Sequence, residues 1–135
     1  MWSAWSLPYR GRLGGLDFAS LCAVQHGFAR PATILLVEDN RPLRSLITRL
    51  LALGGAIVIT ESHGRDALEI GRQYGVAVDL LIADVQMSGQ DGITLMLEFR
   101  ALCPAILVLL ITGFWNPRLE VLKQFGLHCL LKPFS

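Results

Sequence analysis

The stretch TILLVEDNRP, residues 33–42, decides the fold of this chain. Its first part, residues 33–37, is the kind of apolar run found in strands that are buried on both faces of a sheet. Two acidic residues, Glu38 and Asp39, follow at once. Asn40 then suits the N-cap of a helix that has proline in its first turn. The stretch therefore predicts a buried strand, an acidic turn and a helix.

The same alternation of a short apolar run and an amphipathic segment continues along the chain. The predicted strands are residues 33–37, 56–60, 80–83, 106–111 and 128–131. The predicted helices are one from Asn40 to Gly54-Gly55, one over about 64–74, one over about 92–102, and one from Pro117 to Gly126. Five buried strands alternating with four helices favour an open α/β fold with a parallel sheet and right-handed crossovers.

The composition excludes several classes of protein. The net charge is +1 and the basic residues are scattered, so we expect no direct binding of nucleic acid. The longest apolar stretch, residues 50–59, is interrupted by two glycines and is shorter than the roughly 20 residues of a membrane span. We therefore expect no membrane contact. An odd set of cysteines (Cys22, Cys103 and Cys129) without metal-ligand spacing predicts reduced thiols and a cytoplasmic protein.

Residues 1–31 differ in composition from the rest of the chain. They contain two of the three tryptophans and no clear periodicity before Pro31. We expect an N-terminal extension that is disordered or contains a short helix over residues 16–28. Residues 32–135 are long enough to form one α/β domain.

Polar side chains stand where four of the five predicted strands end. These residues are Glu38 and Asp39, then Asp84, then Thr112, and finally Lys132. In open α/β sheets the binding site lies beyond the carboxyl ends of the strands, so we expect these groups to converge. Three neighbouring acids repel one another unless a cation lies among them, and Mg²⁺ prefers such hard oxygen ligands.

This set of groups suits phosphoryl transfer to a carboxylate, a reaction that depends mainly on positioning and charge neutralisation. Asp84 is predicted to accept the phosphoryl group. Asp39 and Asp84 are predicted to hold Mg²⁺, with Glu38 acting directly or through water. Lys132 would pair with one phosphoryl oxygen, and the Thr112 hydroxyl would donate a hydrogen bond to another.

Four stretches together resemble the response-regulator receiver domain of two-component signalling over about residues 32–134. They are ILLVEDN (34–40), DLLIADVQMSGQDG (79–92), LITG (110–113) and LKPF (131–134). The resemblance implies a flavodoxin-like, doubly wound five-stranded parallel sheet with strand order 2-1-3-4-5. It also implies phosphorylation of Asp84 by a sensor histidine kinase or phosphotransfer protein. The backbone carbonyl of Gln86 would complete the Mg²⁺ shell, and the Lys132–Pro133 bond would be cis.

Three features depart from the family pattern. Ser88 stands where the family often has proline, which is a mild change within a loop. Cys129 replaces an aromatic residue that usually couples phosphorylation to the surface. The sequence stops at Ser135, so the family's fifth helix is absent from it. Residues 16–28 would cover this region, or a second subunit would cover it in a homodimer formed through the uncovered fifth strand. Alternatively, the sequence is a fragment of a longer regulator.

Two other functions compete with phosphoryl acceptance. The first is a receiver-like scaffold that acts through protein contacts without phosphorylation. The second is a true enzyme, but a phosphatase with an aspartyl-phosphate intermediate would usually have an acid where Gln86 stands. The glycine motifs of nucleotide-binding proteins are also missing after the first strand. We therefore expect a phosphoacceptor signalling domain that assists its own phosphorylation and dephosphorylation, and no classical enzyme.

Overall fold

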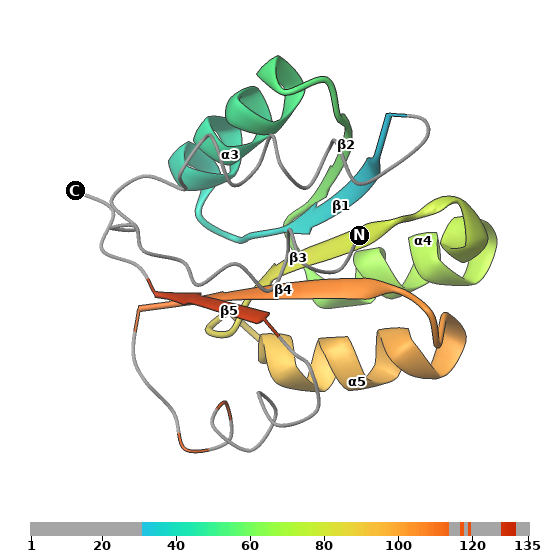
Figure 1. The fold of residues 1–135 in the computed structure, drawn as a ribbon. Helices are drawn as coiled ribbons and strands as arrows, with labels where there is room; N and C mark the ends of the chain where they lie inside the picture. Colours follow the sequence, from blue (N-terminus) through green and yellow to red (C-terminus); the bar gives the residue numbers. More distant parts are fainter. Residues whose placement is uncertain (1–30, 114–116, 118, 120–127, 132–135) are drawn as a thin grey trace.

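The structure is a computed structural model that describes residues 31–113, 117, 119 and 128–131. The elements in these ranges are β1 (Thr33–Val37), α3 (Arg41–Leu53), β2 (Ile57–Glu61), α4 (Gly64–Tyr74), the short 3₁₀ helix η1 (Gly75–Ala77), β3 (Leu80–Asp84), α5 (Gly92–Leu102), β4 (Leu107–Thr112) and β5 (His128–Leu131) (Figure 1). All strand pairs are parallel, and the sheet order is β2-β1-β3-β4-β5. The predicted sheet and strand order are therefore confirmed.

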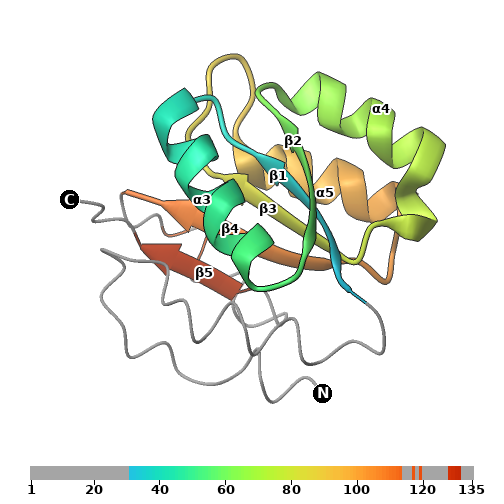
Figure 2. The same cartoon turned by 90° about the horizontal axis from the view of Figure 1, so that it is seen from above.

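Helices cover both faces of the sheet because successive side chains of a strand point in opposite directions. In β1, Leu35 and Val37 pack in a core shared with α4 and α5, whereas Ile34 and Leu36 pack in a second core with α3. Figure 1 shows α3 on one side of the sheet and α4 and α5 on the other. Seen from above, α3 lies over the strands (Figure 2). The sheet is thus doubly wound.

Side-chain caps fix where two of the helices begin. The Asn40 side chain accepts a hydrogen bond of 3.0 Å from the backbone N–H of Leu43 at the start of α3. The Asp91 side chain accepts one of 2.8 Å from Thr94 at the start of α5. Such caps satisfy N–H groups that have no partner within the helix. The prediction of Asn40 as an N-cap is confirmed.

Two strands are shifted by one residue from their predicted bounds. Both β2 and β4 begin and end one residue later than predicted. The backbone N–H of Ala56 bonds to the carbonyl of Leu51 in α3, at 3.1 Å. Similarly, the N–H of Ile106 bonds to the carbonyl of Cys103, also at 3.1 Å. Both N–H groups therefore close turns after helices instead of joining the sheet.

Several predictions fall outside the described residues. These are the N-terminal extension apart from Pro31, most of the helix predicted after Asn116, the Lys132–Pro133 bond, and everything that follows β5. In the part of the chain that the structure describes, no helix is both long and apolar enough to cross a membrane.

We predict that Phe99→Ala lowers the free energy of unfolding by about 3–5 kcal/mol, the usual range for removing a buried aromatic ring. Phe99 is fully buried on α5, between the sheet and α4. Leu97→Ala on the same helix is the control, because Leu97 is 54% exposed. Its effect should stay within about 0.5 kcal/mol. Urea unfolding measures both variants, and equal losses would contradict this description of the core.

Candidate metal centre

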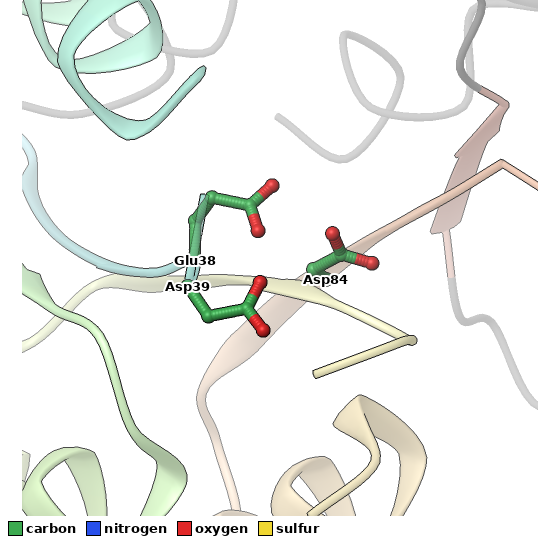
Figure 3. A group of neighbouring side chains, drawn as sticks. All are labelled: Glu38, Asp39 and Asp84. Atoms are coloured by element: carbon green, nitrogen blue, oxygen red, sulfur yellow. The ribbon is translucent and has the colours of Figure 1, made fainter. Parts of the chain in front are cut away.

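The turn after β1 and the last residue of β3 bring three carboxylates together at the carboxyl edge of the sheet. Val37 pairs with Ala83 in the parallel ladder, so the residues that follow each of them start side by side. Each of Glu38, Asp39 and Asp84 offers an oxygen, and these three oxygens lie within 4.8 Å of one another. Figure 3 shows the three side chains gathered in one place.

The burial of these groups makes their charges costly. Glu38 is 1% exposed and Asp84 is 3% exposed, whereas Asp39 is partly exposed. Two unit charges about 4 Å apart interact by about 1 kcal/mol in water, and by about 4 kcal/mol at the effective dielectric constant of a protein surface. A divalent cation would offset this repulsion, and the donor set consists of the hard oxygen ligands that Mg²⁺ and Ca²⁺ take. The residues therefore fit a metal ion.

Backbone hydrogen bonds hold the two buried acids in place. The N–H of Gln86 donates to Oδ1 of Asp84 at 2.9 Å, and the N–H of Asn40 donates to Oε2 of Glu38 at 3.3 Å. The guanidinium of Arg44, on α3, donates to the backbone carbonyl of Glu38 at 2.8 Å. The positions of the carboxylates are thus set by the turns as well as by the strands.

Asp39 is held from the other side of the site by Ser88, in the loop between β3 and α5. Oδ2 of Asp39 accepts from the Ser88 N–H at 3.0 Å and from the Ser88 hydroxyl at 3.2 Å. Burial raises the pKa of Asp39, but the hydrogen bonds from Ser88 and the interaction with Glu38 outweigh it, so the pKa lies below its usual value. This contact was not predicted from the sequence, where the only signal for it is a hydroxyl in the loop that follows the acidic end of a strand.

The other predicted site residues are placed only in part. Thr112 is fully buried at the end of β4, one residue beyond Ile111, the partner of Asp84 in the ladder. Lys132 lies outside the described residues, although Leu131, which precedes it in the sequence, pairs with Thr112. Gln86 follows Asp84 by two residues, and the role of its carbonyl as a ligand stays a prediction.

The start of α5 packs directly against the backbone of the site. The N–H of Gly92 donates to the carbonyl of Val85 at 2.8 Å. A Cβ atom at position 92 would clash with the carbonyl oxygen of Asp84 and would lie 2.9 Å from Cα of Val85. Because these are backbone atoms, no side-chain rotation relieves the contact. Glycine at this position therefore lets α5 approach the end of β3.

A doubly wound parallel sheet with acids clustered at its carboxyl edge defines the architecture of a receiver-type signalling domain. The sequence profile described as the response regulator receiver domain matches residues 34–135. The chain belongs to this family, the receiver domains of two-component response regulators. Receiver domains are signalling domains and not classical enzymes.

Individual relatives agree with this assignment. The chain is 37% identical over 108 residues to the sensor kinase CckA of Brucella abortus (strain 2308), and 37% identical over 104 residues to the transcriptional regulatory protein ZraR of Escherichia coli (strain K12). These matches cover 77% and 76% of this chain, but only 11% and 23% of the two relatives. The chain thus spans less than a quarter of the length of either protein.

Solved structures show the same fold. The receiver domain of the hybrid histidine kinase CckA matches with a TM-score of 0.65 and 35% identity, covering 77% of this chain and 88% of that one. The chemotaxis protein CheY4 of Vibrio cholerae matches with a TM-score of 0.68 and 27% identity, covering 78% and 89%.

We predict that Gly92→Ala destabilises the domain more than Gly71→Ala. The added Cβ of Gly71 would lie 2.9 Å from a ring carbon of Phe99, which is a side-chain contact and not a backbone contact, although the ring is fully buried. The Cβ of Gly92 would meet only backbone. Urea unfolding of both variants gives the two losses of free energy. A smaller loss for Gly92→Ala would show that α5 moves away from β3 without cost.

We also predict that Asp84→Asn stabilises the protein in the presence of a chelator, by about 1 kcal/mol or more, because one of three repelling charges is removed. Asparagine keeps the oxygen that accepts from Gln86. The control is Asp66→Asn in the exposed first turn of α4, which should be neutral or slightly destabilising, by no more than about 1 kcal/mol, because an acid there interacts favourably with the helix N-terminus. Thermal and urea unfolding measure the effect. A less stable Asp84→Asn variant would mean that repulsion among the acids is already offset within the protein.

Proposed function

We propose that this chain is a phospho-accepting switch, which takes a phosphoryl group on Asp84 in a Mg²⁺-dependent reaction. The observation that carries the proposal is the cluster of three carboxylate oxygens within 4.8 Å, in a chain that belongs to the receiver family. The nearly complete burial of Asp84 also supports the proposal, because a buried carboxylate at this edge of the sheet is a candidate for a functional role.

Glu38, Asp39 and Asp84 would hold the cation, together with the backbone carbonyl of Gln86. When bound, Mg²⁺ supplies positive charge that offsets the carboxylates and the phosphoryl oxygens. The backbone N–H of Gln86 donates to Oδ1 of Asp84 at 2.9 Å and so helps to orient the carboxylate that would act as nucleophile.

In the proposed reaction, an Asp84 oxygen forms a bond to phosphorus while the bond from phosphorus to the donor group breaks. The donor leaves with the electron pair of that bond, and Asp84 becomes an acyl phosphate. The Thr112 hydroxyl would donate a hydrogen bond to one phosphoryl oxygen, and Lys132 would pair with another. Their movement toward the phosphate would change the loops that follow β4 and β5.

The proposal extends to the partners and the setting of the protein. The donor would be a sensor histidine kinase or a phosphotransfer protein in the cytoplasm. Residues 32–135 would form the receiver domain and residues 1–31 a separate extension. A homodimer would form through the region around the fifth strand. Because the chain matches only part of its longer relatives, the output of the signal belongs to this proposal and not to the family assignment.

We predict that the purified protein, incubated with Mg²⁺ and acetyl phosphate, acquires one phosphoryl group. The modification should be labile to hydroxylamine and to base, as expected for an acyl phosphate, and intact-protein mass spectrometry measures it. Asp84→Asn should remove it, because an amide is a poor nucleophile. A chelator should remove it as well, because the cation that would neutralise charge developing on the phosphoryl group is then missing.

Asp66→Asn is the matched control, since this exposed acid lies on α4, outside the carboxylate cluster, and should be labelled like the wild type. Equal labelling of Asp84→Asn and wild type would place the modification elsewhere and refute the proposal. A wild-type protein that takes no label, even with a large excess of donor, would favour the phosphorylation-independent scaffold.

A further inference from the structure

The hydrogen bonds between Ser88 and Asp39 join two loops that are distant in the sequence. Both donors of Ser88, the backbone N–H and the hydroxyl, reach the same oxygen, Oδ2 of Asp39, across 49 positions of the chain. A carboxylate oxygen has about two lone-pair sites, so these two bonds fill Oδ2. Oδ1 is the oxygen of Asp39 that Ser88 does not contact.

The conformation of Asp39 that receives these bonds is also the one that builds the acidic cluster. With the bonds to Ser88 in place, Asp39 still offers an oxygen within 4.8 Å of oxygens from Glu38 and Asp84. Glu38 and Asp84 are buried and held by backbone N–H groups, whereas Asp39 is partly exposed. A partly exposed carboxylate would otherwise rotate more freely, so Ser88 restricts the least confined of the three.

The loop that carries Ser88 is itself well anchored. Gly89 follows with a φ of +82°, a region that glycine adopts without strain, and no atom lies within 4 Å of the place where its Cβ would stand. A few residues later, Asp91 caps α5 and Gly92 bonds back to Val85. The segment that follows Ser88 is therefore held at the start of α5.

We propose that Ser88 is a positioning residue of the metal centre, one that orients the Asp39 carboxylate through Oδ2 so that Oδ1 faces the cation. The inference rests on the proposed function, because it assumes that Asp39 is a metal ligand. Ligating carboxylates are commonly held by such outer hydrogen bonds, and their loss lowers metal affinity about 10- to 100-fold.

The two donors of Ser88 allow a graded test. Ser88→Ala removes the hydroxyl and keeps the N–H, so we expect it to weaken Mg²⁺ binding about tenfold. Ser88→Thr keeps both donors and should restore affinity to near the wild-type value. Ser88→Pro lacks both donors and should bind more weakly than Ser88→Ala. Isothermal titration calorimetry with Mg²⁺ alone measures each affinity, and urea unfolding without cation shows whether each variant is folded.

A double-variant comparison separates positioning from general damage to the loop. Ser88→Ala should have no further effect on Mg²⁺ affinity in the Asp39→Asn background, because the oriented carboxylate is already gone. Equal Mg²⁺ affinity for wild type and Ser88→Ala, or an equal loss in both backgrounds, would overturn the inference. If the wild type accepts phosphate with Mg²⁺ while Ser88→Ala binds Mg²⁺ normally, only the role of Ser88 fails. If the wild type binds no Mg²⁺, both proposals fail.

Discussion

The parallel sheet brings the carboxylates of Glu38, Asp39 and Asp84 to one edge, where their like charges repel one another when all three are ionised. Val37 and Ala83 are paired in the ladder, so the acids that follow must share one edge. Both neighbouring strands are buried, which leaves little freedom for the chain to relax. The order of the strands thus gathers a set of carboxylate oxygens that fits a divalent cation.

The loops around this edge are arranged to keep the acids in place. Gln86, Asn40 and Ser88 each direct a backbone N–H at one of the three carboxylates, so each acid has its own anchor. For Asp39, the hydrogen bonds from Ser88 help to hold the pKa below its usual value, and the ionised form is the one that a cation needs. The start of α5 also packs closely against β3, because Gly92 lies against the backbone of Asp84 and Val85.

Two departures from the family pattern, Cys129 and Ser88, lie in different parts of the domain. They concern the response to phosphorylation in the proposed switch more than the acceptance of phosphate. Cys129, where an aromatic residue is usual, packs against the core shared with α5 and is partly buried. A thiol cannot swing between exposed and buried positions as a large ring does. Ser88, in contrast, adds a contact to Asp39 that a proline at that position could not make through its backbone. The two substitutions thus affect different parts of the domain.

The sequence by itself determined the order of the elements, the parallel sheet and the acids at its edge, because apolar runs, caps and strand ends are local features. The N-cap at Asn40 and the bounds of α4 and α5 follow from the same signals. Only the tertiary structure decided that Ser88 donates twice to Asp39 and that Gly92 touches the backbone of Asp84. Both contacts join segments whose approach depends on how the loops close over the sheet. No spacing in the sequence encodes that geometry.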